Sequence, residues 1–396
     1  MSKAAKSSAK GKRAAPAPPR PVTTALDAAI DRALAEKRIV GTVVIMAEDG
    51  VITYHRAAGF ADREAGAAMQ PATWFRYASV TKAFTTVAAL RLIAQGRLSP
   101  DDPVAEWLPE FTPNLVDGSP AAITVGDLMA HMAGLDYGFN QRADGSYAAA
   151  GVSDGISERE ISLAENLRRI ASVPIDITPG KDWRYSMGTD VLGAVIEAVT
   201  DSALPFAMAD LVTGPLALDA AFSLPSKHNL AAAYADALPE PRLMEGVTRV
   251  QGLLPEGQAF AFDPERITDL AAFPSGGGGM AGTAEAAITL LETLRTGPFL
   301  GPELRAAAAT DRAHFGAEGH PLRGPGYGHA WAGAVHLDPE QSGAGLSKGS
   351  LAWGGIYGHS WFIDPERKRS VLALTNTAVE GMSGQFSLDI RDATAL

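Results

Sequence analysis

The spacing of apolar residues predicts two helices in the first quarter of the chain. Apolar side chains recur every three or four residues from Leu26 to Leu34. This is the period of an amphipathic helix, which we expect over residues 25–37 with Thr24 as its cap. A second helix, apolar on nearly every face, is predicted over residues 79–95 and therefore belongs in a core.

Strands are predicted at both ends of the chain. Two β-rich runs, residues 42–46 and 51–55, enclose Asp49-Gly50, a dipeptide typical of a two-residue hairpin turn. Near the other end we expect strands at residues 334–337, 350–353, 360–363 and 370–375, and a closing helix over residues 387–392.

The region between them, roughly residues 100–270, favours short helices and loops. Examples are residues 125–132, 163–171 and 190–199. With strands at both ends and helices between, the sequence predicts an α/β fold: an antiparallel sheet flanked by helices, plus a mostly helical inserted domain. The alternation of strand and helix that builds Rossmann and α/β-hydrolase sheets is absent. We expect an α/β domain from residues 23–100 and 271–396, and a helical domain from 101–270.

Composition narrows the possible chemistry. Of 396 residues none is cysteine, which excludes disulfides, cysteine-ligated metal sites and a cysteine nucleophile. The net charge of -11 argues against nucleic-acid or anionic-lipid partners for the protein as a whole. Residues 1–22 carry six basic and no acidic side chains among Ala, Ser and Pro, and are predicted to be disordered. We interpret this basic tail as a solvated extension, with a transit peptide or a basic interaction arm as alternatives.

The first candidate for catalysis is Ser79-Val80-Thr81-Lys82 at the start of the predicted helix. Residues i and i+3 share one helix face, so the Lys82 amine can reach the Ser79 hydroxyl. The positive helix N-terminus and burial both favour a neutral lysine, which can accept the serine proton. The Ser79 amide can also face a developing oxyanion. A solvated lysine at an ordinary helix start is the alternative.

A second serine lies in Gly151-Val152-Ser153-Asp154-Gly155, which matches the nucleophile-elbow pattern G-x-S-x-G. That elbow requires a strand before it and a helix after it. The nine residues before it contain no β-branched run. We therefore interpret Ser153 as part of a loop with two turn glycines.

Two further segments carry residues suited to a cleft. Tyr185 follows a turn and precedes a predicted helix that Thr189 or Asp190 can cap, and its phenol can relay a proton near an ammonium. Trp353-Gly354-Gly355 ends a predicted strand, where glycines allow close backbone approach, and the N–H of Ile356 can be a second oxyanion donor.

Two weaker signals are the glycines at 276–279 and His359. No lysine follows the glycines, so they make a poor phosphate loop, and we interpret them as a flexible rim loop. His359 can orient a group near the Gly354-Gly355 turn, or it can be a structural histidine. The eight histidines show no metal-binding spacing.

Together these segments resemble the family VIII carboxylesterases, the esterase branch of the serine β-lactamase and DD-peptidase superfamily. Ser79-x-x-Lys82, Tyr185-Ser186 and Trp353-Gly354-Gly355 occur in the order and at the spacings of that family. The resemblance runs from about residue 25 to 392 and includes further matching segments at residues 75–78, 97–98, 107–110, 131–137, 276–279 and 358–362.

The resemblance implies a role for each motif. Ser79 would be the nucleophile, Lys82 its general base and Tyr185 the partner in proton transfer to the leaving alkoxide. The backbone amides of Ser79 and Ile356 would form the oxyanion hole. Tyr137, Trp353, Gly354 and Gly355 would bind substrate, and the fold would be that of the β-lactamases and DD-peptidases.

Two departures from the penicillin-recognising relatives shape the substrate prediction. Met187 stands where they usually have the Asn of Y-x-N, and Trp353-Gly354-Gly355 stands where they usually have K-T-G or H-T-G. The second change removes a cation that would hold a carboxylate, so a hydrophobic rim and uncharged esters are expected.

We therefore expect a serine carboxylesterase that hydrolyses short- to medium-chain acyl esters through an acyl-serine intermediate. A β-lactamase, a D-amino-acid amidase or peptidase, or an acyltransferase with the same machinery is the alternative, and a non-enzymatic binding module is a third reading. We expect a small-molecule ester as partner, no cofactor, no metal, no nucleic acid and no membrane. No apolar run approaches the length of a membrane span, which favours a cytoplasmic protein.

Overall fold

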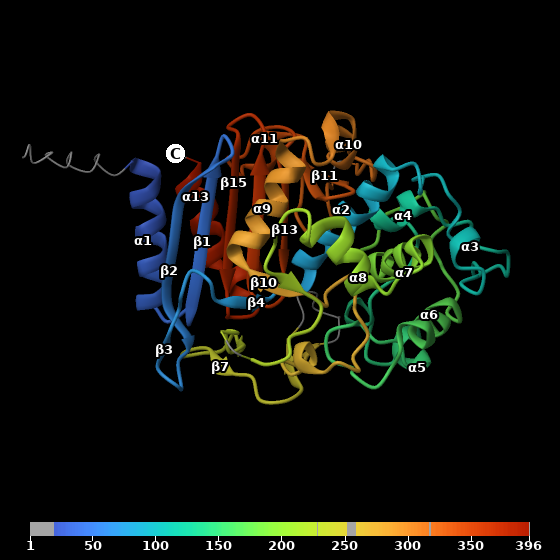
Figure 1. Ribbon diagram of the computed structural model, residues 1–396, viewed down its shortest axis with the longest axis horizontal. Helices are drawn as coiled ribbons and strands as arrows, with labels where there is room; N and C mark the ends of the chain where they lie inside the picture. Colours follow the sequence, from blue (N-terminus) through green and yellow to red (C-terminus); the bar gives the residue numbers. More distant parts are fainter. Residues whose placement is uncertain (1–19, 228, 252–258, 317, 396) are drawn as a thin grey trace, which may run out of the picture.

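The computed structural model describes residues 20–227, 229–251, 259–316 and 318–395 (Figure 1). Most of the predicted basic tail, residues 1–19, lies outside this part. Its last two residues do not belong to a tail, because helix α1 spans Pro21–Ala35 and begins four residues earlier than predicted. Proline at the first helical position has a suitable φ and lacks only an N–H that would be unpaired there, and Val22 is buried.

One eight-stranded antiparallel sheet uses both ends of the chain, in the order β11-β12-β13-β14-β15-β1-β2-β3. Strands from the first seventy residues thus pair directly with strands from the last seventy. The strands are β1 (Gly41–Glu48), β2 (Val51–Asp62), β3 (Ala67–Ala68), β11 (Tyr327–Ala330), β12 (Gly333–His336), β13 (Leu351–Gly355), β14 (His359–Asp364) and β15 (Arg369–Thr375).

The predicted hairpin is confirmed at β1 and β2. Asp49 and Gly50 both have positive φ, 51° and 85°, as a type I′ turn requires. Strand β1 also pairs along its length with β15, from Thr42 opposite Thr375 to Glu48 opposite Arg369. The N-terminal hairpin therefore lies within the sheet.

Helices cover both faces of this sheet. On β15 two successive side chains point in opposite directions: Arg369 donates to the carbonyl of Thr394 in α13 (Gln385–Thr394), and Ser370 donates to Glu292 in α9 (Ala284–Arg295). Figure 1 shows α9 and α13 on either side of the strands, with α1 beside α13. All seven residues of β15 are buried as a result.

Helix α2 (Thr81–Ala94) joins the sheet to the helical region. Eleven of its residues are buried, as its apolar sequence predicts, and it contacts α7 as well as α9. The predicted helix over 125–132 ends early, at Met129, because His131 has a left-handed backbone with φ of 56°. The remaining helices are α3 (Val104–Trp107), α4 (Val125–Met129), α5 (Ser146–Ala150), α6 (Leu163–Ala171), α7 (Gly188–Thr200), α8 (Leu204–Met208), α10 (Gly301–Ala308), α11 (Pro339–Ser342) and α12 (Glu380–Ser383).

Short strands support the segments around the helical region. β4 (Trp74–Arg76), β10 (Ala281–Thr283) and β5 (Ala220–Ala221) form a three-stranded sheet with β10 in the middle. Two separate pairs are β6 (Tyr234–Ala235) with β7 (Arg242–Leu243), and β8 (Thr248–Val250) with β9 (Phe260–Phe262).

Within the described ranges no single helix is long and apolar enough to cross a bilayer. One pair of segments, Gly188–Thr200 and Leu204–Thr213, reaches that length and composition together, with a bend of 81° between them.

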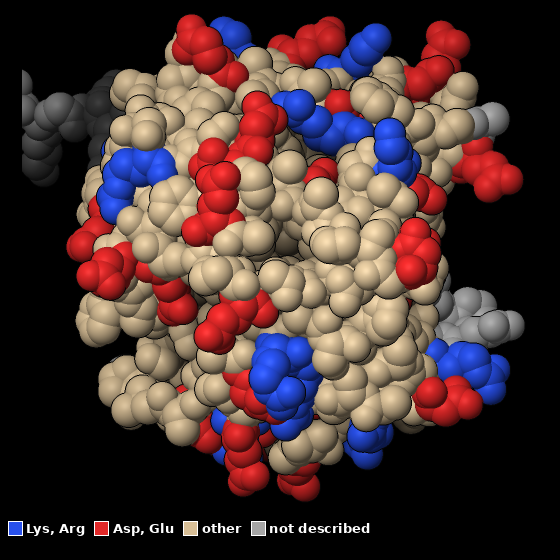
Figure 2. Space-filling view, turned by 90° about the vertical axis from the view of Figure 1, so that its right-hand side faces the viewer, with Lys and Arg blue, Asp and Glu red and all other residues tan. Residues whose placement is uncertain are grey.

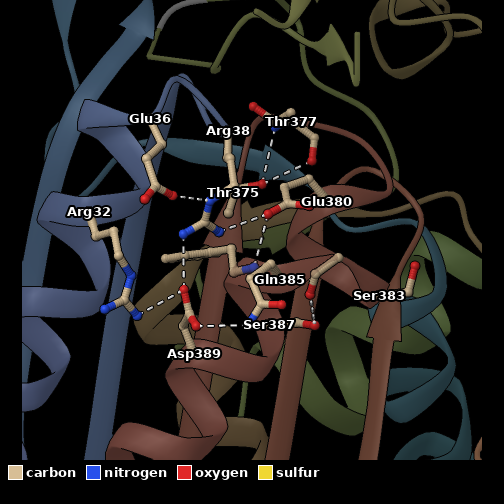
Figure 3. Close-up of polar contacts among 12 residues, drawn as sticks. Arg32, Glu36, Arg38, Thr375, Thr377, Glu380, Ser383, Gln385, Ser387 and Asp389 are labelled. Atoms are coloured by element: carbon tan, nitrogen blue, oxygen red, sulfur yellow. Dashed lines mark hydrogen bonds and ion pairs between the residues drawn. The ribbon is translucent and has the colours of Figure 1, made fainter. Parts of the chain in front are cut away.

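An ion-pair network fastens the last helices to the first one (Figure 3). Arg38, just after α1, donates to Glu380 at 3.0 Å and to Asp389 at 2.9 Å. Arg32 of α1 also pairs with Asp389, at 3.1 Å. The side chains of Glu380 and Asp389 are only 11% and 10% exposed, so they depend on these cations for compensation.

We predict that Arg38→Met lowers the free energy of unfolding by about 2 kcal/mol, because the largely buried Glu380 loses its cation and Asp389 loses one of its two. Urea denaturation measures this change. Arg168→Met is the matched control, since Arg168 pairs with Glu165 on an exposed helix surface and should change stability by less than about 0.5 kcal/mol. Equal effects of the two variants would contradict the structural role of Arg38.

Candidate active site

Ser79 lies at a strained turn between β4 and α2. The preceding Ala78 has φ of 45°, a left-handed conformation that costs a non-glycine residue roughly 1–2 kcal/mol. Neighbouring contacts hold it: the Tyr77 N–H donates to the Met280 carbonyl at 2.9 Å, and the Tyr77 hydroxyl donates to the Thr283 carbonyl at 2.6 Å. A 3₁₀ turn, Ala78–Val80, then leads into α2, so Ser79 precedes α2 by two residues, although we predicted the helix from residue 79.

Lys82 is one turn further along and its amino group is buried among three acceptors. Nζ lies 2.7 Å from the Gly277 carbonyl, 2.9 Å from the Tyr137 hydroxyl and 3.4 Å from Ser79 Oγ. Three acceptors match the three N–H groups of an ammonium. A neutral amine donates two of these bonds and presents its lone pair to the third position, the serine hydroxyl.

Tyr185 approaches the same serine from the helical region. Its hydroxyl donates to Ser79 Oγ at 2.7 Å, and Lys82 Nζ lies 4.9 Å from the centre of its ring. The ring of His131 packs against Tyr185 with centroids 4.8 Å apart. Burial lowers the pKa of His131 well below its usual value, so this histidine is a neutral packing partner.

The glycines at 276–279, which we interpreted as a flexible rim loop, include two residues that line the cavity, Gly277 and Gly278. They form a buried turn against α2 and α7, in which Gly276 and Gly277 offer carbonyls to Thr85 and Lys82. A Cβ at Gly277 would lie 2.3 Å from a carboxylate oxygen of Asp190 and 3.0 Å from the Tyr137 hydroxyl. Only glycine permits this approach.

Asp190 fixes that turn and is not the helix cap that we considered. α7 begins two residues before it and has no side-chain cap. Asp190 Oδ1 accepts from the Ser275 hydroxyl at 2.5 Å. Burial raises the pKa of Asp190, and the charge of Lys82 opposes that rise. The sequence signal was an acidic residue five positions after Tyr185, on the inward face of an apolar helix.

Tyr137 lines the cavity as predicted and also contacts the lysine, which the sequence did not indicate. Its backbone N–H donates to Asp136 at 2.8 Å. Asn140 donates both to Asp136 and to the Tyr185 carbonyl, each at 2.9 Å. The loop that carries Tyr137 is thereby tied to Tyr185.

The end of β13 passes directly beside the Ser79 turn. A Cβ at Gly355 would lie 2.4 Å from the Tyr77 carbonyl oxygen. Gly355 therefore packs against the backbone before Ser79, and a contact of Gly355 with substrate remains a prediction. Trp353, Gly354 and Ile356 line the cavity, and the Trp353 ring packs 5.3 Å from that of Tyr185.

Ser79 opens into a cavity of about 320 Å³, within the range of small-molecule sites. Its wall near the serine is aromatic, and α12 and α13 close another side. On the face that Figure 2 shows, acidic and basic side chains are interspersed around a hollow, without a broad patch of one sign. The walls include Phe139, Ile156, Phe260, Leu322, Met382 and Leu388.

Ser153 makes its hydrogen bonds to residues other than Ser79, Lys82 and Tyr185. It lies in a loop, as predicted, between Gly151 and Gly155 with φ of 66° and 74°. Its hydroxyl donates to Glu158 at 2.8 Å and accepts from the Gly155 N–H at 3.1 Å. Both bonds are structural.

His359 has the structural role that we considered, rather than orienting a group near the Gly354-Gly355 turn. Its Nε2 donates to the Arg76 carbonyl at 2.7 Å, which joins β14 to the strand before Ser79. Burial lowers the pKa of His359 to about 4, so the ring is neutral near pH 7.

Comparisons with known proteins agree with this geometry. Residues 26–395 match the Beta-lactamase family. The chain is 47% identical to Esterase EstB of Burkholderia gladioli over 93% of this chain and 94% of that one.

Solved structures with a similar fold include a hydrolase and a synthase. EstCE1, described as a hydrolase with promiscuous acyltransferase activity, superposes with a TM-score of 0.91 and 41% identity, covering 95% of this chain and 99% of its own. Unliganded simvastatin synthase LovD from Aspergillus terreus has a TM-score of 0.71 at 20% identity, covering 96% and 98%, and shares the fold.

A partly buried acid in the cavity wall, Asp154, gives a test of the site's electrostatics. Asp154 accepts the N–H groups of Gly138 at 2.7 Å and Phe139 at 3.2 Å, and burial raises its pKa to about 7. Between pH 4 and 7 the folded protein holds a proton here that the unfolded chain releases. Stability therefore falls as pH rises through this window.

We predict that, relative to Asp154→Asn, the wild type loses about 2 kcal/mol of unfolding free energy between pH 5 and 7. Urea denaturation at several pH values measures this difference, and other titrating groups cancel in it. Asp144→Asn is the control, because that side chain is 82% exposed. Parallel pH curves for wild type and Asp154→Asn would show that the carboxyl titrates normally.

Proposed function

The chain belongs to the Beta-lactamase family, and from this premise we propose that it is a serine carboxylesterase acting through an acyl-serine intermediate on short- to medium-chain acyl esters. One observation carries the proposal: Ser79 Oγ lies 2.7 Å from the Tyr185 hydroxyl and 3.4 Å from Lys82 Nζ, at an apolar cavity. The 47% identity to an esterase over nearly the whole chain supports the reaction class.

In the acylation step Ser79 Oγ attacks the ester carbonyl carbon while its proton passes to the neutral amine of Lys82. The carbonyl oxygen becomes an oxyanion, which the backbone N–H groups of Ser79 and Ile356 stabilise. The bond to the alcohol oxygen then breaks, and that oxygen takes the proton of the Tyr185 hydroxyl. The Lys82 ammonium returns a proton to the tyrosinate.

Deacylation reverses these roles. A water molecule attacks the acyl carbon and gives its proton to the neutral amine of Lys82, and Ser79 leaves with a proton that the Lys82 ammonium returns directly or through the Tyr185 hydroxyl. The products are the free acid and the regenerated serine. An acceptor alcohol in place of water would give a new ester, and the acyltransferase activity in the description of EstCE1 favours testing this second outcome.

The other expectations remain predictions of the same proposal. We expect no cofactor and no metal in the reaction, no nucleic-acid or membrane partner, and a cytoplasmic location. The division into an α/β domain, residues 23–100 with 271–396, and a helical domain, residues 101–270, is proposed as well, with Ser79 where the two meet.

We predict that Ser79→Ala lowers 4-nitrophenyl butyrate hydrolysis by at least about 10⁴-fold, since no nucleophile remains. Ser153→Ala should keep turnover within a few-fold of wild type, because its hydroxyl bonds to Glu158 and Gly155 and not to Ser79, Lys82 or Tyr185. The reverse pattern would overturn the site assignment. Efficient turnover of a chromogenic cephalosporin with negligible ester hydrolysis would overturn the substrate class, and addition of benzyl alcohol tests for transfer.

We also predict that Tyr137→Phe lowers kcat about 10- to 100-fold with little change in KM, because Lys82 loses one of its three partners. Steady-state kinetics on the same ester measure this. Tyr147→Phe is the matched control: Tyr147 is equally buried, but its hydroxyl accepts the Asp136 N–H and does not contact Lys82. Equal losses in both variants would indicate a packing defect.

A further inference from the structure

The cavity contains a cation that the sequence did not lead us to expect. The motif Trp353-Gly354-Gly355 lacks the lysine or histidine of the penicillin-recognising relatives. The structure places Arg323, thirty residues earlier, with its guanidinium carbon 5.4 Å from the centre of the Trp353 ring. Its side chain is exposed and lines the cavity.

The guanidinium of Arg323 is free to bind a ligand. Within the described ranges its side chain makes no hydrogen bond or ion pair, and its contact is the face of Trp353. Two arginines elsewhere are saturated by contrast: Arg76 donates to two backbone carbonyls, and Arg38 to three carboxylates. A planar fork of unused donors is suited to two-point binding of a carboxylate.

A second arginine lines the same cavity. Arg391 directs two of its nitrogens at Asp392 and retains a third. Burial raises the pKa of Tyr327, and the charges of Arg323 and Arg391 both oppose that rise, so all three side chains lie within electrostatic reach. The cavity therefore has a locally positive end within a protein of net charge -11.

The helix that carries Arg391 is firmly held. Gln385 and Asp389 occupy one face of α13, where Asp389 pairs with Arg38 and Arg32 (Figure 3). Ser387, Leu388 and Arg391 occupy another face and line the cavity. A fixed cation loses less entropy on binding than one on a mobile segment.

The positive end lies one aromatic layer away from Ser79. Trp353 contacts Arg323 on one side and Tyr185 on another, and the Tyr185 hydroxyl reaches Ser79. Among the described residues that line the cavity, Asp154 is the only carboxylate, and it already accepts the N–H groups of Gly138 and Phe139. The lining therefore offers a substrate carboxylate two cations and one acid with partners of its own.

We propose that Arg323, with Arg391 beside it, binds a carboxylate of the substrate, so that the preferred esters carry a free carboxylate several atoms from the scissile carbonyl. Half-esters of dicarboxylic acids are one such class. This inference rests on the proposed ester hydrolysis and specifies its substrate. It replaces the expectation of an uncharged ester, because a cation is restored to the cleft from a different part of the chain.

The test compares mono-4-nitrophenyl adipate with 4-nitrophenyl hexanoate, which share a six-carbon acyl chain and differ in the terminal carboxylate. Arg323→Gln should lower kcat/KM for the adipate about tenfold through KM, and for the hexanoate less than twofold. Arg323→Lys should fall between, since it keeps the charge and loses the fork. Arg168→Gln, the control for net charge, should change neither. A second pair, 4-acetoxybenzoate and 4-methylphenyl acetate, places the carboxylate on the leaving phenol. Comparing kcat/KM for this pair tests a carboxylate on the alcohol side of the ester.

Equal losses on the charged and the neutral substrate in both pairs would overturn the inference, as would unchanged kinetics on both charged substrates. Hydrolysis of the neutral hexanoate by the wild type, and its loss in Ser79→Ala, tests the proposed ester hydrolysis independently of the carboxylate site. Calorimetry of monomethyl adipate with Ser79→Ala and with Ser79→Ala/Arg323→Gln needs no turnover. Weaker binding to the double variant supports the carboxylate site even if ester hydrolysis fails, and equal binding contradicts it.

Discussion

The buried amino group of Lys82 is the constraint on which the rest of the site depends. A charged or polar nitrogen that leaves water must find a partner for each N–H, or the fold loses several kcal/mol. The three acceptors belong to three segments of the chain. Ser79 lies in the turn that leads into the helix of Lys82, Tyr137 in the helical region, and Gly277 in the turn before β10. Contact with Lys82 Nζ therefore constrains the positions of these three segments relative to one another.

Each of these segments is held by its own supports, and the supports explain residues that have no direct chemistry. Asp190 and Ser275 hold the turn of Gly277, and Asn140 ties the Tyr137 loop to Tyr185. His359 binds the strand that precedes Ser79. Gly355 lets β13 approach that strand closely. Precision of this kind is what proton transfer between Ser79, Lys82 and Tyr185 requires, because the rate depends on sub-ångström geometry.

Much of this could be predicted from local patterns. Asp49-Gly50 encodes its turn, the uniform apolarity of residues 81–94 encodes a buried helix, and strands at both ends without βαβ alternation indicate the antiparallel sheet. The missing context around Ser153 correctly predicted a loop there, because a nucleophile elbow is a local structure. These features are short-range, and short-range physics can be derived from one sequence.

The sequence predictions failed at positions where contacts between distant segments determine the local conformation. Nothing about Gly276 to Gly279 in isolation distinguishes a mobile rim from a turn pressed against two helices. The left-handed Ala78 is visible only through the strands that impose it. Arg323 has no motif around it, and only the packing on Trp353 brings its charge into the cavity. Likewise Pro21 starts α1 because Val22 finds a core to enter, which a sequence window cannot show.

The pairing of β1 with β15 has a consequence for how the protein matures on the ribosome. β1 emerges early, but the partner for one of its edges is made more than three hundred residues later. Until then the hairpin has an unpaired edge, and the cavity lacks both β13 and α13. A nascent chain must remain incomplete, with exposed β-structure, through most of translation. Protection of that edge during synthesis is thus the main demand that this topology places on the cell.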